Sequence, residues 1–121
     1  MNEATSYNAY ITQTVLDAER GVWNDKTYTP NEAVLKFLDA CLDLELQTTH
    51  SWSGARTISK VALLRTYGGP TTRITHTIDS PHQVEVRTVW GSQKAFCEIY
   101  APLLVETMME AAGYLLNGED D

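Results

Sequence analysis

The sequence has few cysteines and no long apolar run. Its two cysteines, Cys41 and Cys97, each lie within an apolar pattern, which predicts buried free thiols in a reducing compartment rather than a disulfide framework. No apolar stretch approaches the ~18 residues that a membrane-spanning helix needs. The stretch from Met1 to Thr5 has neither the basic nor the apolar region of a secretory leader. We therefore expect a cytoplasmic protein that does not bind membranes.

The sequence also lacks the residue spacings that metal sites and catalytic sites use. Its histidines and cysteines form no close ligand pair such as C-x2-C or H-x3-H. The stretch Asp79-Ser80-Pro81-His82 is typical of a turn, and neighbours on a tight turn cannot align as a catalytic triad. Tyr67-Gly68-Gly69-Pro70 leads into a predicted strand and lacks the lysine of a phosphate-binding loop. We predict no catalytic, metal-binding or cofactor-binding residue, and we expect a protein that is not an enzyme.

Charge is distributed unevenly along the chain, whose net charge is −7. Residues 1–55 carry eight acids and three bases (−5), and residues 56–94 carry two acids and six bases (+4). Residues 95–121 carry six acids and no base (−6). Acidic ends thus flank a basic middle, and this separation points to binding of a charged partner.

Three segments show the apolar spacing of amphipathic helices. The first runs from about Ser6 to Trp23. The second begins at Thr29-Pro30-Asn31-Glu32, where the Thr29 hydroxyl can accept a bond from a free backbone N–H, and it fades near Gln47. The third runs from about Pro102 to Leu116, because proline suits the first turn of a helix. The apolar stripe of the second helix consists of Val34, Phe37, Leu38, Cys41 and Leu42.

The middle of the chain has the composition and the two-residue alternation of strands. Residues 57–67 are rich in β-branched and apolar side chains. Residues 72–79 and 84–90 alternate apolar and polar side chains on either side of a turn, which predicts a hairpin. Residues 94–100 fit a fourth strand, with a helix that starts at Ser92 as the alternative.

The predicted order of elements is therefore α-α-β-β-β-β-α. Consecutive strands joined by short turns imply a four-stranded antiparallel β-meander, and the three amphipathic helices must cover one of its faces. The chain has 121 residues and no repeat or long linker. We expect a single α+β domain that spans residues 1–121.

Acids of the predicted helices are the main candidates for a binding surface. Asp39 and Asp43 are one turn apart on the second helix, and a solvated face explains them better than a divalent-ion site does, because no carbonyl-rich loop accompanies them. Trp52 lies in a polar stretch and is either a lid over the core or a contact with a partner. The predicted protein-binding residues are Asp39, Asp43, Glu45, Trp52, Glu106 and Glu110.

Bases of the predicted sheet form a second candidate surface, on the sheet face that no helix covers. They are Lys60, Arg65, Arg73, Arg87 and Lys94. Tyr67, Trp90 and Tyr100 could stack nucleic-acid bases there, but the acidic flanks repel a phosphate backbone, and we do not expect direct binding to nucleic acid. The basic side chains can instead pair with acids of the helices or of a second copy, so a homodimer is an alternative.

Two short motifs resemble a pattern in small proteins of phages, plasmids and other mobile elements. The apolar segment Ala62–Tyr67 runs into Gly68-Gly69-Pro70 and a strand pair, and Val89-Trp90-Gly91 precedes a further strand and helix. In size, acidity and lack of a catalytic motif, the chain is also similar to virus-encoded anti-defence proteins, including anti-CRISPR inhibitors. The resemblance implies a protein that occupies a surface of a defence complex or partly imitates nucleic-acid charge. It assigns no functional residue.

We therefore expect a non-enzymatic acidic binding protein of a phage or mobile element that blocks a host defence complex of CRISPR type, in the host cytoplasm if a virus encodes it. Its partner would be a protein with a basic surface, such as a nucleoprotein complex. Two alternatives stay open: a self-associating structural or adaptor domain, and a small ligand-binding domain with a pocket around His76, Arg87 and Tyr100. No cofactor is expected in the leading hypothesis.

Overall fold

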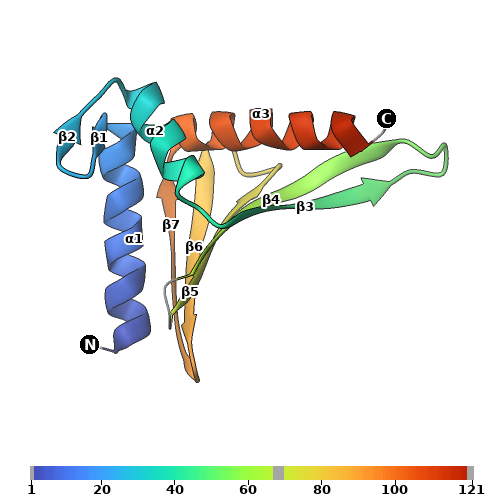
Figure 1. The fold of residues 1–121 in the computed structure, drawn as a ribbon. Helices are drawn as coiled ribbons and strands as arrows, with labels where there is room; N and C mark the ends of the chain where they lie inside the picture. The colour runs from blue at the N-terminus through green and yellow to red at the C-terminus, as the bar shows by residue number, and fades with distance from the viewer. Residues whose placement is uncertain (1, 67–69, 120–121) are drawn as a thin grey trace.

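The structure is a computed structural model that describes residues 2–66 and 70–119, and these residues form three helices, a five-stranded sheet and a two-stranded hairpin (Figure 1). The elements are α1 Glu3–Glu19, β1 Val22–Trp23, β2 Lys26–Thr27, α2 Pro30–Asp39, β3 Asp43–His50, β4 Arg56–Thr66, β5 Thr71–Thr77, β6 Gln83–Trp90, β7 Gln93–Tyr100 and α3 Pro102–Glu119. The large sheet is antiparallel with strand order β3-β4-β5-β6-β7. The predicted α+β class is confirmed, but the order of elements is α-β-β-α-β-β-β-β-β-α.

The prediction of a four-stranded sheet is wrong by one strand, because the second helix ends early. α2 ends at Asp39, and β3 begins at Asp43. From Asp43 onward, apolar and polar side chains alternate with a period of two, which a helix cannot place on one face. Pairing with β4 turns Leu44 and Leu46 towards the core.

α1 starts and ends earlier than the predicted helix. The Asn2 side chain caps it by accepting a hydrogen bond from the Thr5 N–H at 2.7 Å. The helix stops before Gly21, whose φ of +91° belongs to the left-handed region. Val22-Trp23, predicted as helix, pairs with β2 across Asn24-Asp25, whose φ angles of 49° and 62° fit a type I′ turn.

The predicted starts of the later helices and the later strands are confirmed. Thr29 Oγ1 accepts a hydrogen bond from the Glu32 N–H at 3.2 Å at the start of α2. α3 begins at Pro102, and residues 94–100 lie in a strand, β7, rather than a helix. β5 and β6 pair as the predicted hairpin. The break at Gly68-Gly69 lies outside the described residues.

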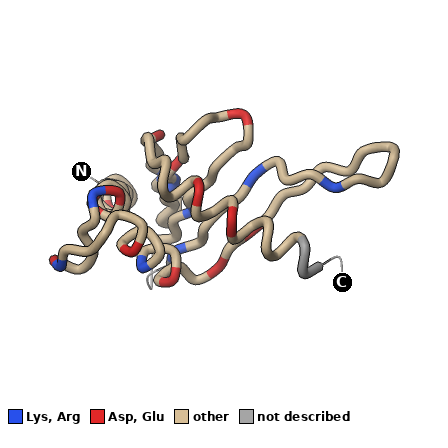
Figure 2. The backbone as a smooth tube through the Cα atoms, turned by 90° about the horizontal axis from the view of Figure 1, so that it is seen from above, with Lys and Arg blue, Asp and Glu red and all other residues tan. Residues whose placement is uncertain are grey.

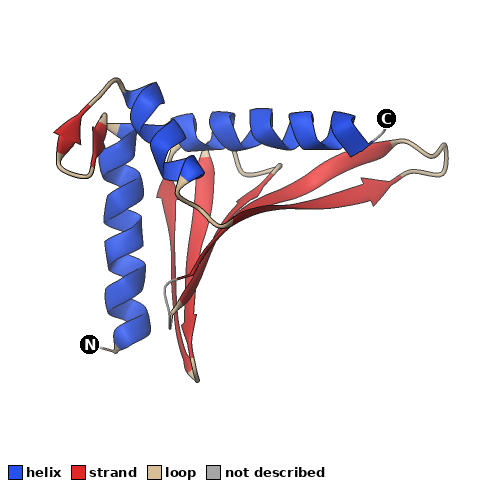
Figure 3. Ribbon diagram, in the orientation of Figure 1, coloured by secondary structure: helices blue, strands red, loops and turns tan. Residues whose placement is uncertain are grey.

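All three helices lie on the same side of the five-stranded sheet (Figure 3). α1 contacts β6 and β7, α3 contacts β4 and β6, and α2 contacts both other helices. The core between these layers includes Ile11, Val15, Val34, Phe37, Val61, Leu63, Ile74, Val84, Val86, Leu104 and Met108. Within the described residues no helix covers the opposite face, which we call the outer sheet face.

A buried polar cluster fixes the position of α1 on the sheet. Asn8 is 5% exposed, and its Nδ2 donates hydrogen bonds to the Val86 carbonyl at 2.8 Å and to Thr88 Oγ1 at 3.2 Å. Thr88 Oγ1 in turn lies 2.8 Å from Thr72 Oγ1. Because an unsatisfied polar group would be costly in this interior, the bonds also determine how α1 is rotated about its axis.

Part of the β3–β4 hairpin projects beyond the rest of the sheet (Figures 1 and 3). β5 pairs only with Lys60 to Thr66 of β4, so residues 48–58 form a hairpin with no third strand. The strand register shifts between Gln47 and Thr48, at the base of this projection. We call residues 48–58 the arm.

Candidate protein interface

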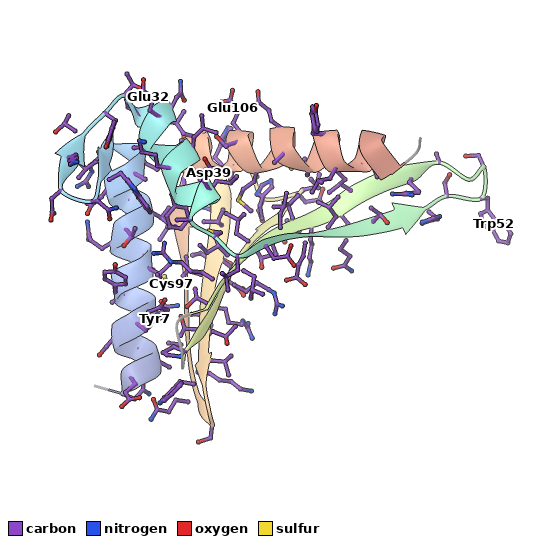
Figure 4. The ribbon with its side chains drawn as sticks, viewed as in Figure 1. Tyr7, Glu32, Asp39, Trp52, Cys97 and Glu106 are labelled. Carbon is purple, nitrogen blue, oxygen red and sulfur yellow. The ribbon has the colours of Figure 1, made fainter. Side chains whose placement is uncertain are left out.

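The predicted acidic residues do not form one surface. Asp39, at the end of α2, and Glu106, on α3, are exposed on the helical layer (Figure 4). Glu110, one turn further along α3, is exposed as well. Asp43 and Glu45, expected on a helix, lie on β3 instead, where the alternation of the strand places both on the outer sheet face. Two of the predicted acids are therefore separated from the other three by the sheet.

One of the predicted bases is not on the exposed sheet surface. Arg65 follows Val61 and Leu63 at two-residue spacing in β4, so it shares their core face. It is 4% exposed, and its guanidinium carbon lies 5.4 Å from the centroid of the Phe37 ring. The prediction that Arg65 lines an exposed basic surface is wrong. The other predicted bases are exposed on the outer sheet face as expected, namely Lys60, Arg73, Arg87 and Lys94.

The outer sheet face carries acids among its bases. Arg73 Nη2 lies 2.9 Å from Glu45 Oε1, and Arg87 Nε lies 3.0 Å from Glu85 Oε1. Figure 2 shows acidic and basic positions interleaved over the fold rather than parted into two halves. The outer sheet face therefore does not have the one-signed basic surface that was predicted to pack on the acidic helices of another copy.

Trp52 projects from the tip of the arm (Figure 4). Its relative exposure of 106% means that the indole touches almost nothing else in the molecule. The tip is closed by backbone hydrogen bonds from Ser51 N to the Ala55 carbonyl and from Gly54 N to the Ser51 carbonyl, both 3.0 Å long. The alternative that Trp52 is a lid over the core is wrong, and the side chain is free to enter a pocket of another molecule.

Sequence reasoning missed the arm, although the signal was present. Residues 44–48 alternate apolar and polar side chains, and Ile58 begins the next apolar run. The segment Ser51–Ala55 between them contains serine and glycine, a composition typical of a hairpin turn. The helical spacing of the apolar residues before it led to the prediction of a helix through this alternating segment.

A shallow hollow of about 310 Å³ lies on the outer sheet face across β3, β4 and β5. Its walls are largely polar and include the paired side chains of Glu45 and Arg73. Small-molecule sites are usually apolar clefts with a few polar groups, so the hollow lacks the character of such a site.

The three residues of the predicted ligand pocket do not meet. His76 is 4% exposed on the core face, and its Nδ1 lies 2.9 Å from the Gln83 carbonyl oxygen. Arg87 and Tyr100 are exposed on the outer sheet face. The sheet therefore separates the histidine from the other two side chains.

The thiols and the possible metal ligands of the described residues were the remaining candidates for a chemical site. Burial raises the pKa of Cys41 to about 11, and the charge of Arg65 only partly opposes this effect. Cys41 is therefore a protonated, weakly nucleophilic thiol at neutral pH. Cys97 Sγ lies 3.2 Å from Thr12 Oγ1. The described residues contain no group of three or more His, Cys, Asp or Glu side chains that could hold a metal ion.

Among the described residues, no helix combines the length and the apolarity that crossing a bilayer requires. Comparisons of the chain with protein-family models, with curated proteins and with solved structures find no match.

Proposed function

We propose that this protein binds a protein partner without catalysing a reaction, and that Trp52 anchors the contact. The observation that carries the proposal is the full exposure of Trp52 at the tip of the arm. A tryptophan left in water forgoes the burial of roughly 150–250 Å² of surface. Tryptophan is also prominent among the few residues that dominate binding energy in protein interfaces. The arm would carry the indole into a recess of the partner.

The acids of the helical layer are proposed to steer a basic partner towards the protein. Asp39, Glu106 and Glu110 are exposed and form no ion pair within the described residues. The chain as a whole carries a net charge of −7. Unpaired surface charge of one sign accelerates encounter with the opposite sign, and added salt weakens this effect.

The partner class that we propose is a nucleoprotein defence complex of CRISPR type, on the resemblance to anti-defence proteins of mobile elements. Such complexes hold nucleic acid in a positively charged channel, which an acidic protein can approach. In this proposal the protein is an inhibitor from a phage or mobile element that occupies the surface of the complex. Partial imitation of nucleic-acid charge would contribute to the attraction.

Trp52→Ala tests the anchor, with Tyr114→Ala as the matched control. Tyr114 is also an exposed aromatic side chain, at 85% exposure, but it lies on α3. Binding to immobilised CRISPR effector complexes would be measured at low salt. We expect Trp52→Ala to weaken binding by roughly 30-fold or more, and Tyr114→Ala to change it by about twofold at most. Because both side chains are exposed, the free energy of unfolding should change by less than ~0.5 kcal/mol in each variant.

Two outcomes of this experiment would count against the proposal. Tight binding by Trp52→Ala would show that Trp52 does not anchor the contact. Failure of the wild-type protein to bind any effector complex would show that the partner is not of this class.

The proposed steering role of the acids is tested by the double variant Glu106→Gln/Glu110→Gln, which should associate with the partner more slowly and with a weaker dependence on salt. An unchanged association rate would exclude steering by these acids.

A further inference from the structure

The two edge strands of the sheet are built differently. β3 has a register shift between Gln47 and Thr48, and its charged outer side chains, Asp43 and Glu45, carry the same sign, so both features discourage pairing with a second copy of the strand. β7 pairs with β6 in unbroken register along its 8 residues and contains no proline. It also exposes Phe96 by 67% and Tyr100 by 64%. A regular edge strand with exposed aromatic residues is suited to pairing with another chain.

The free edge of β7 presents a regular set of backbone groups. β6 and β7 are joined by the two-residue turn Gly91-Ser92, in which Gly91 has a φ of 58°, so the pair that closes the hairpin is hydrogen-bonded. Such pairs recur at every second residue, which directs the N–H and C=O groups of Lys94, Phe96 and Glu98 away from β6. Within the described residues no other strand pairs with β7.

The outer side chains of β7 complement their own two-fold image. Lys94 and Glu98 lie two residues on either side of Phe96, and neither forms an ion pair within the part of the chain that the structure describes. We propose that β7 pairs antiparallel with β7 of a second copy, with Phe96 opposite Phe96 at the two-fold axis. In this register each Lys94 faces Glu98 of the other copy, and one sheet continues through both molecules.

The same register relieves a repulsion within the chain. Glu98 lies directly opposite Glu85 across the β6–β7 ladder, and like charges in this position are destabilising. Arg87 pairs with Glu85 at 3.0 Å, which leaves Glu98 uncompensated. Lys94 of the second copy would supply the missing positive charge.

α1 is placed to form a second layer of the interface. It runs parallel to β7, because Asn8 Nδ2 lies 3.4 Å from the Ala95 carbonyl and Thr12 Oγ1 lies 3.2 Å from Cys97 Sγ. An open groove of about 620 Å³ lies between α1 and β7. The side chains on its helix wall are those of Thr5, Asn8, Ala9, Thr12 and Gln13.

The proposed two-fold axis brings the two α1 helices side by side and antiparallel. Paired strands lie about 4.8 Å apart, and each α1 contacts both β6 and β7 of its own sheet. The helix axes would therefore lie roughly 10 Å apart, which is within the usual range for packed helices. The small side chains of Thr5 and Ala9 permit this approach, so the second copy would fill the groove.

Charge distinguishes this register from its neighbours. A shift that brings Cys97 to the two-fold axis places Phe96 opposite Glu98 and leaves Lys94 opposite Tyr100. Neither charged residue then has a partner of opposite sign. The complementary charges therefore favour the register centred on Phe96.

A charge-swap series measured by sedimentation equilibrium tests the dimer. The wild-type protein is expected to show twice the mass of the chain, whereas Lys94→Glu and Glu98→Lys should each weaken association roughly tenfold or more, because two ion pairs become two repulsions. The double variant Lys94→Glu/Glu98→Lys should regain the dimer. An equimolar mixture of the two single variants should form a heterodimer, since each supplies the charge that the other needs.

Matched controls carry the same charge changes elsewhere. Lys26→Glu on the β1–β2 hairpin and Glu110→Lys on α3 are exposed positions away from β7 and should leave the dimer intact. A wild-type protein that is monomeric at all concentrations would overturn the proposal. Single variants that dimerise as well as the wild type, or a mixture that stays monomeric, would also overturn it.

A cysteine at the two-fold axis tests the register. In a Cys41→Ala/Cys97→Ser background, Phe96→Cys should form a disulfide between two copies on mild oxidation, because facing Cα atoms about 5.5 Å apart suit this bond. Efficient crosslinking through Cys97 in the wild-type protein would instead indicate the shifted register. Trp52→Ala should not change the mass of the assembly, since the arm lies at the opposite edge of the sheet. The dimer and the proposed partner contact can therefore fail independently.

Discussion

Gly21 joins α1 to the β1–β2 hairpin in a conformation that only glycine adopts without strain. Its φ is +91°, and a Cβ atom built there would lie 2.5 Å from the Tyr28 carbonyl oxygen. That carbonyl belongs to the same tight connection, in which the Tyr28 N–H donates to the Gly21 carbonyl at 2.7 Å. Backbone atoms cannot move aside as the end of a flexible side chain can, so only glycine, which has no Cβ atom, fits at position 21.

Gly21→Ala should therefore destabilise the fold, and Gly113→Ala is the matched control. We expect the first change to lower the free energy of unfolding by about 2 kcal/mol or more, from left-handed strain and the clash. Gly113 lies within α3, and a Cβ there meets nothing within 4 Å. Gly113→Ala should raise the free energy of unfolding by about 0.5–1 kcal/mol, because alanine is the better helix former. Urea denaturation measures both effects, and equal stability of the two variants would contradict this account.

At the scale of elements, the end of α1 caps the start of α3. Glu19 Oε1 accepts a hydrogen bond from the Leu103 N–H at 3.1 Å, and Oε2 accepts one from the Leu104 N–H at 2.7 Å. The first N–H groups of a helix have no partner within the helix, and Ala101 and Pro102 have no side chain that could cap them. The carboxylate also lies at the positive end of the helix dipole. The Glu19 side chain thereby fixes α1 against α3, although the two helices lie far apart in the sequence.

Removing this cap should loosen the junction between α1 and α3. We expect Glu19→Ala to lower the free energy of unfolding by about 1–2 kcal/mol, and Glu19→Gln by less, because the amide keeps an acceptor but loses the charge. The control is Glu110→Ala, an exposed position for which a change below ~0.5 kcal/mol is expected. If Glu19→Ala unfolds at the same urea concentration as Glu110→Ala, the cap does not contribute to stability.

β3 shows why the second helix was predicted to extend too far, to about Gln47. Leu38, Cys41 and Leu42 continue the helical spacing of α2, but Leu42 is 65% exposed and lies outside the helix. Leu44 and Leu46 follow with a strand period, so the segment satisfies both patterns over a few residues. β4 decides between them, because pairing with its long apolar edge buries Leu44 and Leu46 and satisfies the backbone of β3.

For the molecule as a whole, the arrangement of charge differs from its distribution along the chain. The basic middle segment forms most of the sheet, but β3 brings two acids from the acidic N-terminal segment onto the same face. β6 and β7 add Glu85 and Glu98. The outer sheet face therefore carries four bases and four acids, namely Lys60, Arg73, Arg87 and Lys94 with Asp43, Glu45, Glu85 and Glu98.

Because the outer sheet face carries as many acids as bases, it should bind nucleic acid poorly. We expect the wild-type protein to bind labelled single-stranded or duplex DNA with a Kd weaker than ~100 µM at physiological salt, measured by fluorescence anisotropy. The variant Glu45→Gln/Glu85→Gln frees the charges of Arg73 and Arg87 and should bind more tightly, with an affinity that falls as salt rises. Micromolar binding by the wild-type protein with a steep salt dependence would contradict the expectation.

The sequence alone determined the α+β class, the starts of α2 and α3, the β5–β6 hairpin and the strand character of residues 94–100. These features depend on signals that act over a few residues. Thr29 can cap only the N–H groups next to it, Pro102 suits only the first turn of a helix, and side-chain alternation follows from the geometry of a single strand.

Only the tertiary structure decided where the charges and Trp52 lie. Arg65 is buried because its strand position faces the helices, and Glu45 meets Arg73 because β3 pairs with β4 and β4 with β5 in one register. Trp52 is exposed because the arm extends past the last strand that could cover it. Each outcome depends on pairing between segments far apart in the chain, and local residue patterns do not specify that register.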